Sequence, residues 1–335
     1  MGIFDNGNSC FPLQSFSTPT EFKTLSELKK DFHCNQGYLV NFKQEMKITI
    51  TLLLVFTNLL SAQIKGVVKD SITGKPIPYA NIWVENENIG ASTEENGEFV
   101  INANPNKNLI FSALGFEKKT LKASQTQVVK LASKSYQLED VVILKKTESK
   151  IIEIGKSKNA IYQAFDNGPR IDVKYFPYFI RYKKTKFIKQ VTVETDSKIE
   201  AATVKIHFYS VDANGFPGEE LLTKDFVVTV PNGVVKNIFN VSDFNLRMPK
   251  KGLFVGFEKL IIEKNKSETT VTNYNTNVTS IKKSYSPLVL YNLVETDFLF
   301  TFSGGKWNKE IHYDSANVPI QRMVYEPAIN LILTN

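Results

Sequence analysis

Three acidic residues stand close together in one turn-rich segment. Asp212, Glu219 and Glu220 flank the sequence Asn214-Gly215-Phe216-Pro217-Gly218. Carboxylate oxygens are the ligands that calcium prefers, so these three residues are the calcium candidates of the chain. A solvated turn explains the same residues and is the favoured interpretation, so we expect no bound metal and no cofactor.

The histidines do not form a catalytic pattern. The chain has only His33, His207 and His312, none of them in a His-x-x-Glu arrangement. A zinc peptidase needs two histidines and a glutamate around one metal ion, which excludes that class. Glycosidases use two carboxylates that flank the scissile bond, and no spacing singles out such a pair. We therefore expect a protein without catalytic residues.

Aromatic residues are dense in one stretch. Tyr175, Tyr178 and Tyr182 alternate with Phe176 and Phe179. Exposed aromatic rings can stack on sugar rings, which makes the three tyrosines the ligand-binding candidates. A strand packed in a core explains the same residues and is the favoured interpretation.

The elements that position these residues are predicted to be strands. Val204, Ile206 and Phe208 alternate with polar residues, the pattern of a strand with one wet face, and His207 falls on that wet face. Turns such as Asn96-Gly97 recur along the chain. The fold class is therefore all-β. Further strands are expected after the first domain at 225–230, 234–241, 253–262, 287–291, 297–302 and 328–333, which favours a jelly-roll-like sandwich.

Residues 64–144 carry a specific series of turn and strand residues. They include Gly66-Val67-Val68, Asp70, Thr73-Gly74, Pro76-Ile77-Pro78, Ala80-Asn81-Ile82, Gly90, Thr93, Asn96-Gly97-Glu98-Phe99, Ser112 and Gly115-Phe116. This series resembles the carboxypeptidase regulatory-like domain. Leu138 to Ile143 is similar to the strand that closes this domain in TonB-dependent outer-membrane receptors. The resemblance implies a transthyretin-like, seven-stranded Greek-key sandwich, and an accessory rather than a peptidase role.

The second domain has a looser resemblance. The stretch from Phe208 to Gly218 is similar to loops of extracellular bacterial jelly-roll modules, and Phe254 to Glu258 is similar to the strand that often follows. We carry no function across on this likeness.

An export signal is predicted inside the chain rather than at its start. Met46-Lys47 precedes a mostly apolar run from Ile48 to Leu60, and small residues follow at 61–62. This order is typical of a signal peptide over 46–63, and the run is short for a membrane span. We expect translation to begin at Met46, with 1–45 a disordered, non-native extension that holds both cysteines. The alternative is a genuine extension that turns the run into a membrane anchor.

The remaining boundaries and the charge complete the sequence-based hypothesis. A charged connector over 145–156 separates the first domain from a second domain over 157–335. The formal charge of +7 comes from scattered lysines without a nucleic-acid motif, so no nucleic acid is expected.

The hypothesis is an exported, non-catalytic cell-envelope protein that binds a glycan or protein partner and is not integral to the membrane after signal cleavage. The periplasm or the outer membrane is favoured over the cell surface. The alternative function is a glycan-active hydrolase with its acids in the second domain.

Overall fold

The computed structural model describes residues 63–134, 149–156 and 163–335. These residues form strands, with four short 3₁₀ turns as the only helical elements of this part of the chain. The expected extension (1–45), almost all of the signal peptide (46–63) and the closing strand Leu138–Ile143 lie outside the described residues.

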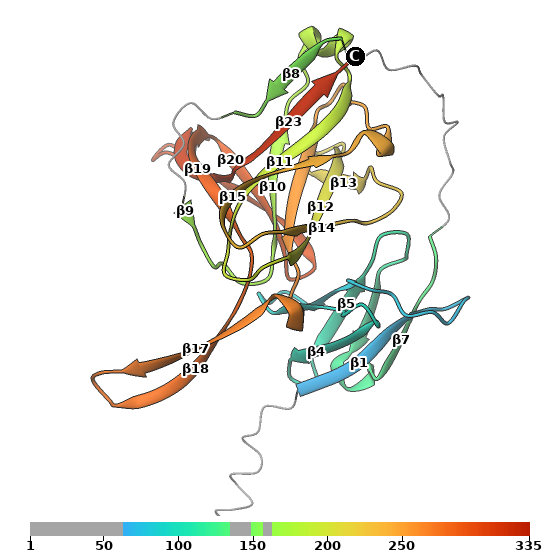
Figure 1. Cartoon of the computed structure of the whole chain (residues 1–335), viewed down its shortest axis with the longest axis vertical. Helices are drawn as coiled ribbons and strands as arrows, with labels where there is room; N and C mark the ends of the chain where they lie inside the picture. Colours follow the sequence, from blue (N-terminus) through green and yellow to red (C-terminus); the bar gives the residue numbers. More distant parts are fainter. Residues whose placement is uncertain (1–62, 135–148, 157–162) are drawn as a thin grey trace, which may run out of the picture. The chain divides into compact units, whose positions relative to one another are not determined.

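The first domain is a two-sheet sandwich of seven strands, which confirms the expected architecture (Figure 1). β1 (Gln63–Asp70) lies between β4 (Glu98–Asn102), its antiparallel neighbour, and β7 (Val128–Leu131), its parallel one. The second sheet has the order β3-β2-β5-β6. Its strands are β2 (Asn81–Val84), β3 (Gly90–Ser92), β5 (Asn108–Ser112) and β6 (Lys119–Lys122).

The core and the turns of this domain follow from its sequence pattern. In β4, Phe99 and Ile101 are buried while Val100 between them is half exposed, as alternation requires. The turn before β4 depends on Gly97, which has φ +76, and a Cβ there would meet the Val68 carbonyl oxygen at 2.7 Å. Asp70 closes the first turn by accepting hydrogen bonds from the Ile72 amide and the Thr73 hydroxyl.

The second domain is a larger sandwich of two sheets. One sheet has the order β13-β12-β16-β10-β20-β21, and β14 also pairs with β12. Its strands are β10 (Ile171–Phe176), β12 (Ala202–Val211), β13 (Pro217–Glu220), β14 (Phe226–Val230), β16 (Leu253–Lys259), β20 (Phe298–Ser303) and β21 (Lys306–Ile311).

The facing sheet has the order β22-β19-β11-β23-β8, with β15 paired to β11 and β9 paired to β19. Its strands are β8 (Ile151–Ile154), β9 (Gln163–Ala164), β11 (Phe187–Ser197), β15 (Gly233–Asn240), β19 (Leu288–Thr296), β22 (Arg322–Pro327) and β23 (Ile329–Thr334). Two further strands, β17 (Lys266–Asn273) and β18 (Val278–Tyr285), pair only with each other.

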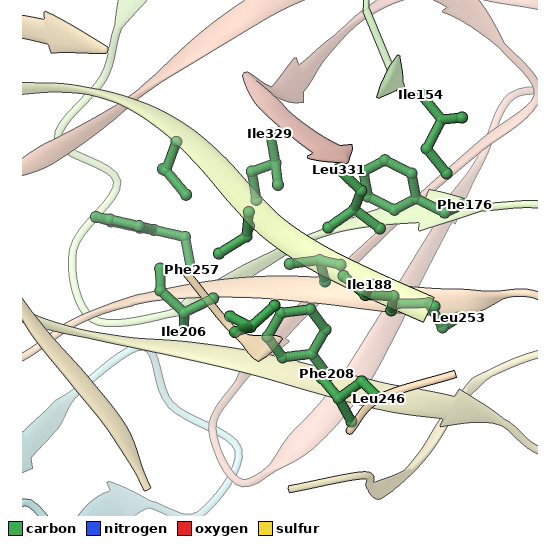
Figure 2. Packing of buried hydrophobic residues seen from close by; sticks show 14 of the residues in the cluster. Ile154, Phe176, Ile188, Ile206, Phe208, Leu246, Leu253, Phe257, Ile329 and Leu331 are labelled. Atoms are coloured by element: carbon green, nitrogen blue, oxygen red, sulfur yellow. The ribbon is translucent and has the colours of Figure 1, made fainter. Parts of the chain in front are cut away.

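Apolar side chains from both sheets fill the space between them (Figure 2). Ile206 and Phe208 of β12 meet Leu253 and Phe257 of β16 in one sheet, and Ile329 lies opposite in β23 of the other. Each is almost completely removed from water. Burial of such side chains stabilises the fold by about 1.5–3 kcal/mol apiece.

One expected boundary needs correction. Residues 151–154 fall in the predicted connector, yet they form β8 and pair with β23 of the second domain. Ile152 and Ile154 turn towards the core, which gives this charged segment an apolar face that belongs to a strand. Within the described residues, no helix has the length and apolar character needed to cross a membrane.

Candidate functional site

A cavity of about 400 Å³ lies in the second sandwich and is lined by strands of both sheets. β10, β20 and β21 supply one side, β19 and β22 supply the other, and the segment after β9 also lines it. Small-molecule sites are typically concave, mostly apolar and about 300–1,000 Å³ in volume. The lining residues are Phe165, Asn167, Arg170, Asp172, Val173, Tyr291, Leu299, Phe300, Thr301, Glu310, His312, Met323, Val324, Tyr325 and Pro327.

A closed group of three polar side chains forms the floor of this cavity. Nη2 of Arg170 lies 2.8 Å from Oδ1 of Asp172 and donates a hydrogen bond of 2.8 Å to the Tyr291 hydroxyl. The Tyr291 hydroxyl in turn hydrogen-bonds the Asp172 carboxylate. The Asp172 side chain is only 10% exposed, so its charge is stabilised by these partners rather than by bulk water.

Burial dominates the electrostatics of the floor. Removal from water raises the pKa of Asp172, and the Arg170 guanidinium opposes that rise. Burial also raises the pKa of Tyr291, and the nearby Asp172 carboxylate adds to the effect. The tyrosine therefore stays protonated and remains a hydrogen-bond donor throughout the physiological range.

Aromatic and apolar side chains form the walls. The rings of Phe165 and Tyr325 meet edge to face at a centroid distance of 4.8 Å, and Phe165 also lies 5.7 Å from the Tyr291 ring. Nε2 of His312 lies 3.5 Å from the Glu310 carboxylate at the rim. A wall of rings beside a floor of fixed polar groups suits a ligand with both apolar and hydroxyl-bearing faces.

A second polar cluster lies on the outer face of β12. Nδ1 of His207 lies 2.9 Å from Glu220 of β13, and Nε2 lies 2.7 Å from Glu258 of β16. Glu220 also accepts a hydrogen bond from the Phe208 amide. The Tyr209 ring stacks on the imidazole at 5.4 Å, with 11° between the planes.

The two carboxylates keep this histidine charged despite its burial. Burial alone lowers the pKa of His207, but its hydrogen bonds to Glu220 and Glu258 outweigh that effect and raise the pKa to about 9. For Glu258, burial raises the pKa, and the hydrogen bond and charge of His207 more than reverse this and lower it.

The prediction that the His207 side chain faces solvent is therefore wrong. The His207 side chain is only 12% exposed, because β13 and β16 bring carboxylates over both ring nitrogens. The cluster is an internal ion pair, and its members do not line the cavity described above.

The three calcium candidates have separate partners. Asp212 caps its own turn by accepting hydrogen bonds from the Asn214 and Phe216 amides. Glu219 is exposed and pairs with Lys134 at 3.0 Å, whereas Glu220 turns inward to His207. The described residues contain no group of three His, Cys, Asp or Glu side chains arranged to hold a metal ion.

The three tyrosine candidates also separate. Tyr182 is buried in the inter-sheet core, and Tyr178 packs against it edge to face. Tyr175 lies on the outer face of its sheet, 5.0 Å from the Phe254 ring, and its hydroxyl donates to the Lys251 carbonyl oxygen. The structure therefore does not bring them together around one ligand.

The residues that line the cavity were not found from the sequence. Phe165 and Arg170 lie in one segment, whereas Tyr291 and Tyr325 come from two others, and no local spacing connects these three segments. The available signal was the pair Arg170-x-Asp172, a charged pair at the start of the strand Ile171–Phe176.

Comparison with known families bears on the first domain. Residues 64–143 match the family model of the CarboxypepD_reg-like domain. This confirms the resemblance expected from the turn residues and agrees with the seven-stranded sandwich. The CarboxypepD_reg-like domain is a regulatory type of domain, and the match does not extend to the cavity in the second sandwich. No curated protein and no solved structure matches the chain.

Proposed function

We propose that this protein is an exported, non-catalytic binding protein of the cell envelope, and that the cavity of its second sandwich holds a sugar unit of a glycan. The observation that carries the proposal is the cavity of about 400 Å³ between the two sheets, with the Phe165 and Tyr325 rings beside a fixed polar floor. Export is supported by the signal-like order of residues 46–63.

Sugar rings match this surface chemically. A pyranose presents an apolar face of C–H groups to an aromatic ring and carries hydroxyls around its edge. Asn167, Thr301 and the rim histidine His312 line the same cavity and offer donors and acceptors for those hydroxyls. Because the floor is already held by its own hydrogen bonds, the site is organised before a ligand enters.

One feature of the cavity favours the alternative of a glycan hydrolase. Asp172 and Glu310 are both carboxylates and both line it. Asp172 is paired with Thr301 of β20, and Thr301 is paired with Asn308 of β21, two residues before Glu310. Two strand spacings and two residues of rise separate the Cα atoms of the two acids by about 12 Å. The Asp172 carboxylate is already held by the Arg170 guanidinium and by the Tyr291 hydroxyl, and the Glu310 side chain is 67% exposed at the rim, so binding is the better-supported function.

A glycan array followed by calorimetry tests the proposal. The purified protein is screened on the array, and each retained glycan is titrated against wild type and against Tyr325→Ala. We expect saturable binding to wild type and at least a tenfold loss in the variant, because Tyr325 supplies a wall of the cavity. At 40% exposure, Tyr325 contributes little to the core, so the variant should fold.

Tyr274→Ala is the matched control. This tyrosine lies between the hairpin strands β17 and β18 and is 91% exposed, so its removal should leave binding unchanged. An array without any retained glycan, or equal affinities for wild type and Tyr325→Ala, contradicts the glycan site. Release of new reducing ends from a bound glycan contradicts the non-catalytic part.

A further inference from the structure

We propose that the cavity recognises an uncharged sugar ring and rejects acidic sugars. This inference rests on the proposed glycan-binding function and narrows it to one class of ligand. It is carried by the charge balance of the residues that line the cavity.

The positive charge in the floor is already neutralised. The Arg170 guanidinium is held by the Asp172 carboxylate at 2.8 Å and by the Tyr291 hydroxyl. A ligand carboxylate that approached Arg170 would meet the Asp172 carboxylate beside it. An acidic ligand would therefore lose its hydration without gaining an unpaired cation, which is unfavourable in a partly buried site.

The rest of the lining supplies no lysine and no second arginine, and its one histidine, His312, lies 3.5 Å from the Glu310 carboxylate. The chain has 41 lysines and arginines and a formal charge of +7, yet the lining of this cavity contains one arginine and no lysine. Glu310 adds a negative charge at the rim, where its side chain is 67% exposed. The net charge of the whole chain attracts anions, but the carboxylates that line this cavity oppose their binding there.

Titration calorimetry with matched sugars tests this preference. The protein is titrated with methyl glycosides of glucose, galactose and mannose and with the corresponding methyl uronides, which differ only in a carboxylate at C6. We expect at least one neutral glycoside to bind, and its uronide to bind at least tenfold more weakly.

Two variants connect the preference to the cavity. Asp172→Asn leaves the Arg170 charge without its counter-ion. We therefore expect the neutral-to-acidic ratio, which is the affinity for the neutral glycoside divided by the affinity for its uronide, to fall at least tenfold. Because Asp172 is buried and the variant could fail to fold, Glu310→Gln provides a second test at an exposed position. Removal of that rim charge should lower the same ratio severalfold.

The outcomes separate this inference from the function on which it rests. If no neutral or acidic sugar binds at any chain length, the glycan-binding function is wrong and this inference falls with it. A uronide that binds as tightly as its neutral partner overturns only the inference. A neutral-to-acidic ratio that is the same in wild type and Glu310→Gln also counts against the charge argument.

Discussion

Replacing His207 by glutamine removes the cation that lies between two buried carboxylates. The imidazolium contacts Glu220 at 2.9 Å and Glu258 at 2.7 Å. A glutamine amide is uncharged, donates from one nitrogen instead of two, and does not titrate. The substitution therefore tests whether the ion pair stabilises the second sandwich and whether that stability depends on pH.

The magnitude follows from the pKa of the histidine. The pKa of His207 is raised from 6.5 to about 9 in the folded protein. Each pKa unit is worth about 1.4 kcal/mol, so the cluster contributes about 3 kcal/mol to the free energy of unfolding. Because the folded pKa is the higher one, this contribution is complete below pH 6.5 and is lost as the pH rises through about 9.

The contribution of Glu258 to stability depends on pH in the opposite direction. The pKa of Glu258 is lowered in the fold, so its contribution is present above its ordinary pKa of 4.5 and is lost as the pH falls through the folded value. Both effects describe the same ion pair and are not added together.

Urea unfolding from pH 6 to pH 10 provides the assay. The Trp307 ring lies 5.2 Å from Tyr209, which stacks on His207, so tryptophan fluorescence reports on this region. We expect wild type to lose about 3 kcal/mol between pH 6 and pH 10, and His207→Gln to be less stable at pH 6 but nearly independent of pH over the same range. His312→Gln, the matched control at the exposed rim of the cavity, should retain the wild-type dependence.

Parallel pH profiles for wild type and His207→Gln would refute the reasoning. They would mean that the histidine is neutral in the folded protein, or that the two carboxylates are satisfied without it. A profile that falls equally in His312→Gln and in wild type, but not in His207→Gln, assigns the effect to the buried cluster.

Two further substitutions test other parts of the second sandwich. Lys205→Met removes a buried ammonium that lies 3.1 Å from Asp225, and because that carboxylate retains some contact with water we expect a loss of about 1–3 kcal/mol in urea unfolding. Gly155→Ala places a Cβ 2.5 Å from the Phe176 ring at a residue with φ +87, so the loss should exceed 2 kcal/mol. Gly74→Ala shares the positive φ but meets no atom within 4 Å, so about 1 kcal/mol is expected for this control; equal losses for the two glycines would contradict the packing argument.

The strands of the first sandwich were predictable because each turn has a local chemical cause. The Asn96-Gly97 turn needs a residue with positive φ, and Gly97 provides it at +76. In the second sandwich, the alternation of Val204, Ile206 and Phe208 identified β12 for the same local reason. The hairpin of β17 and β18 was missed because its exposed Thr, Ser and Asn residues have no buried face, and so leave no apolar period to detect.

The sequence by itself determined that the chain is all-β, that its first domain is a seven-stranded sandwich, and that Val204, Ile206 and Phe208 share one face. These properties depend on residues within a few positions of one another. Tertiary structure alone decided that His207 lies between Glu220 and Glu258. It also decided that Arg170 meets Tyr291, which is 121 residues further along the chain. Strand order and register set those contacts, and both depend on how whole sheets pair and pack rather than on any local pattern.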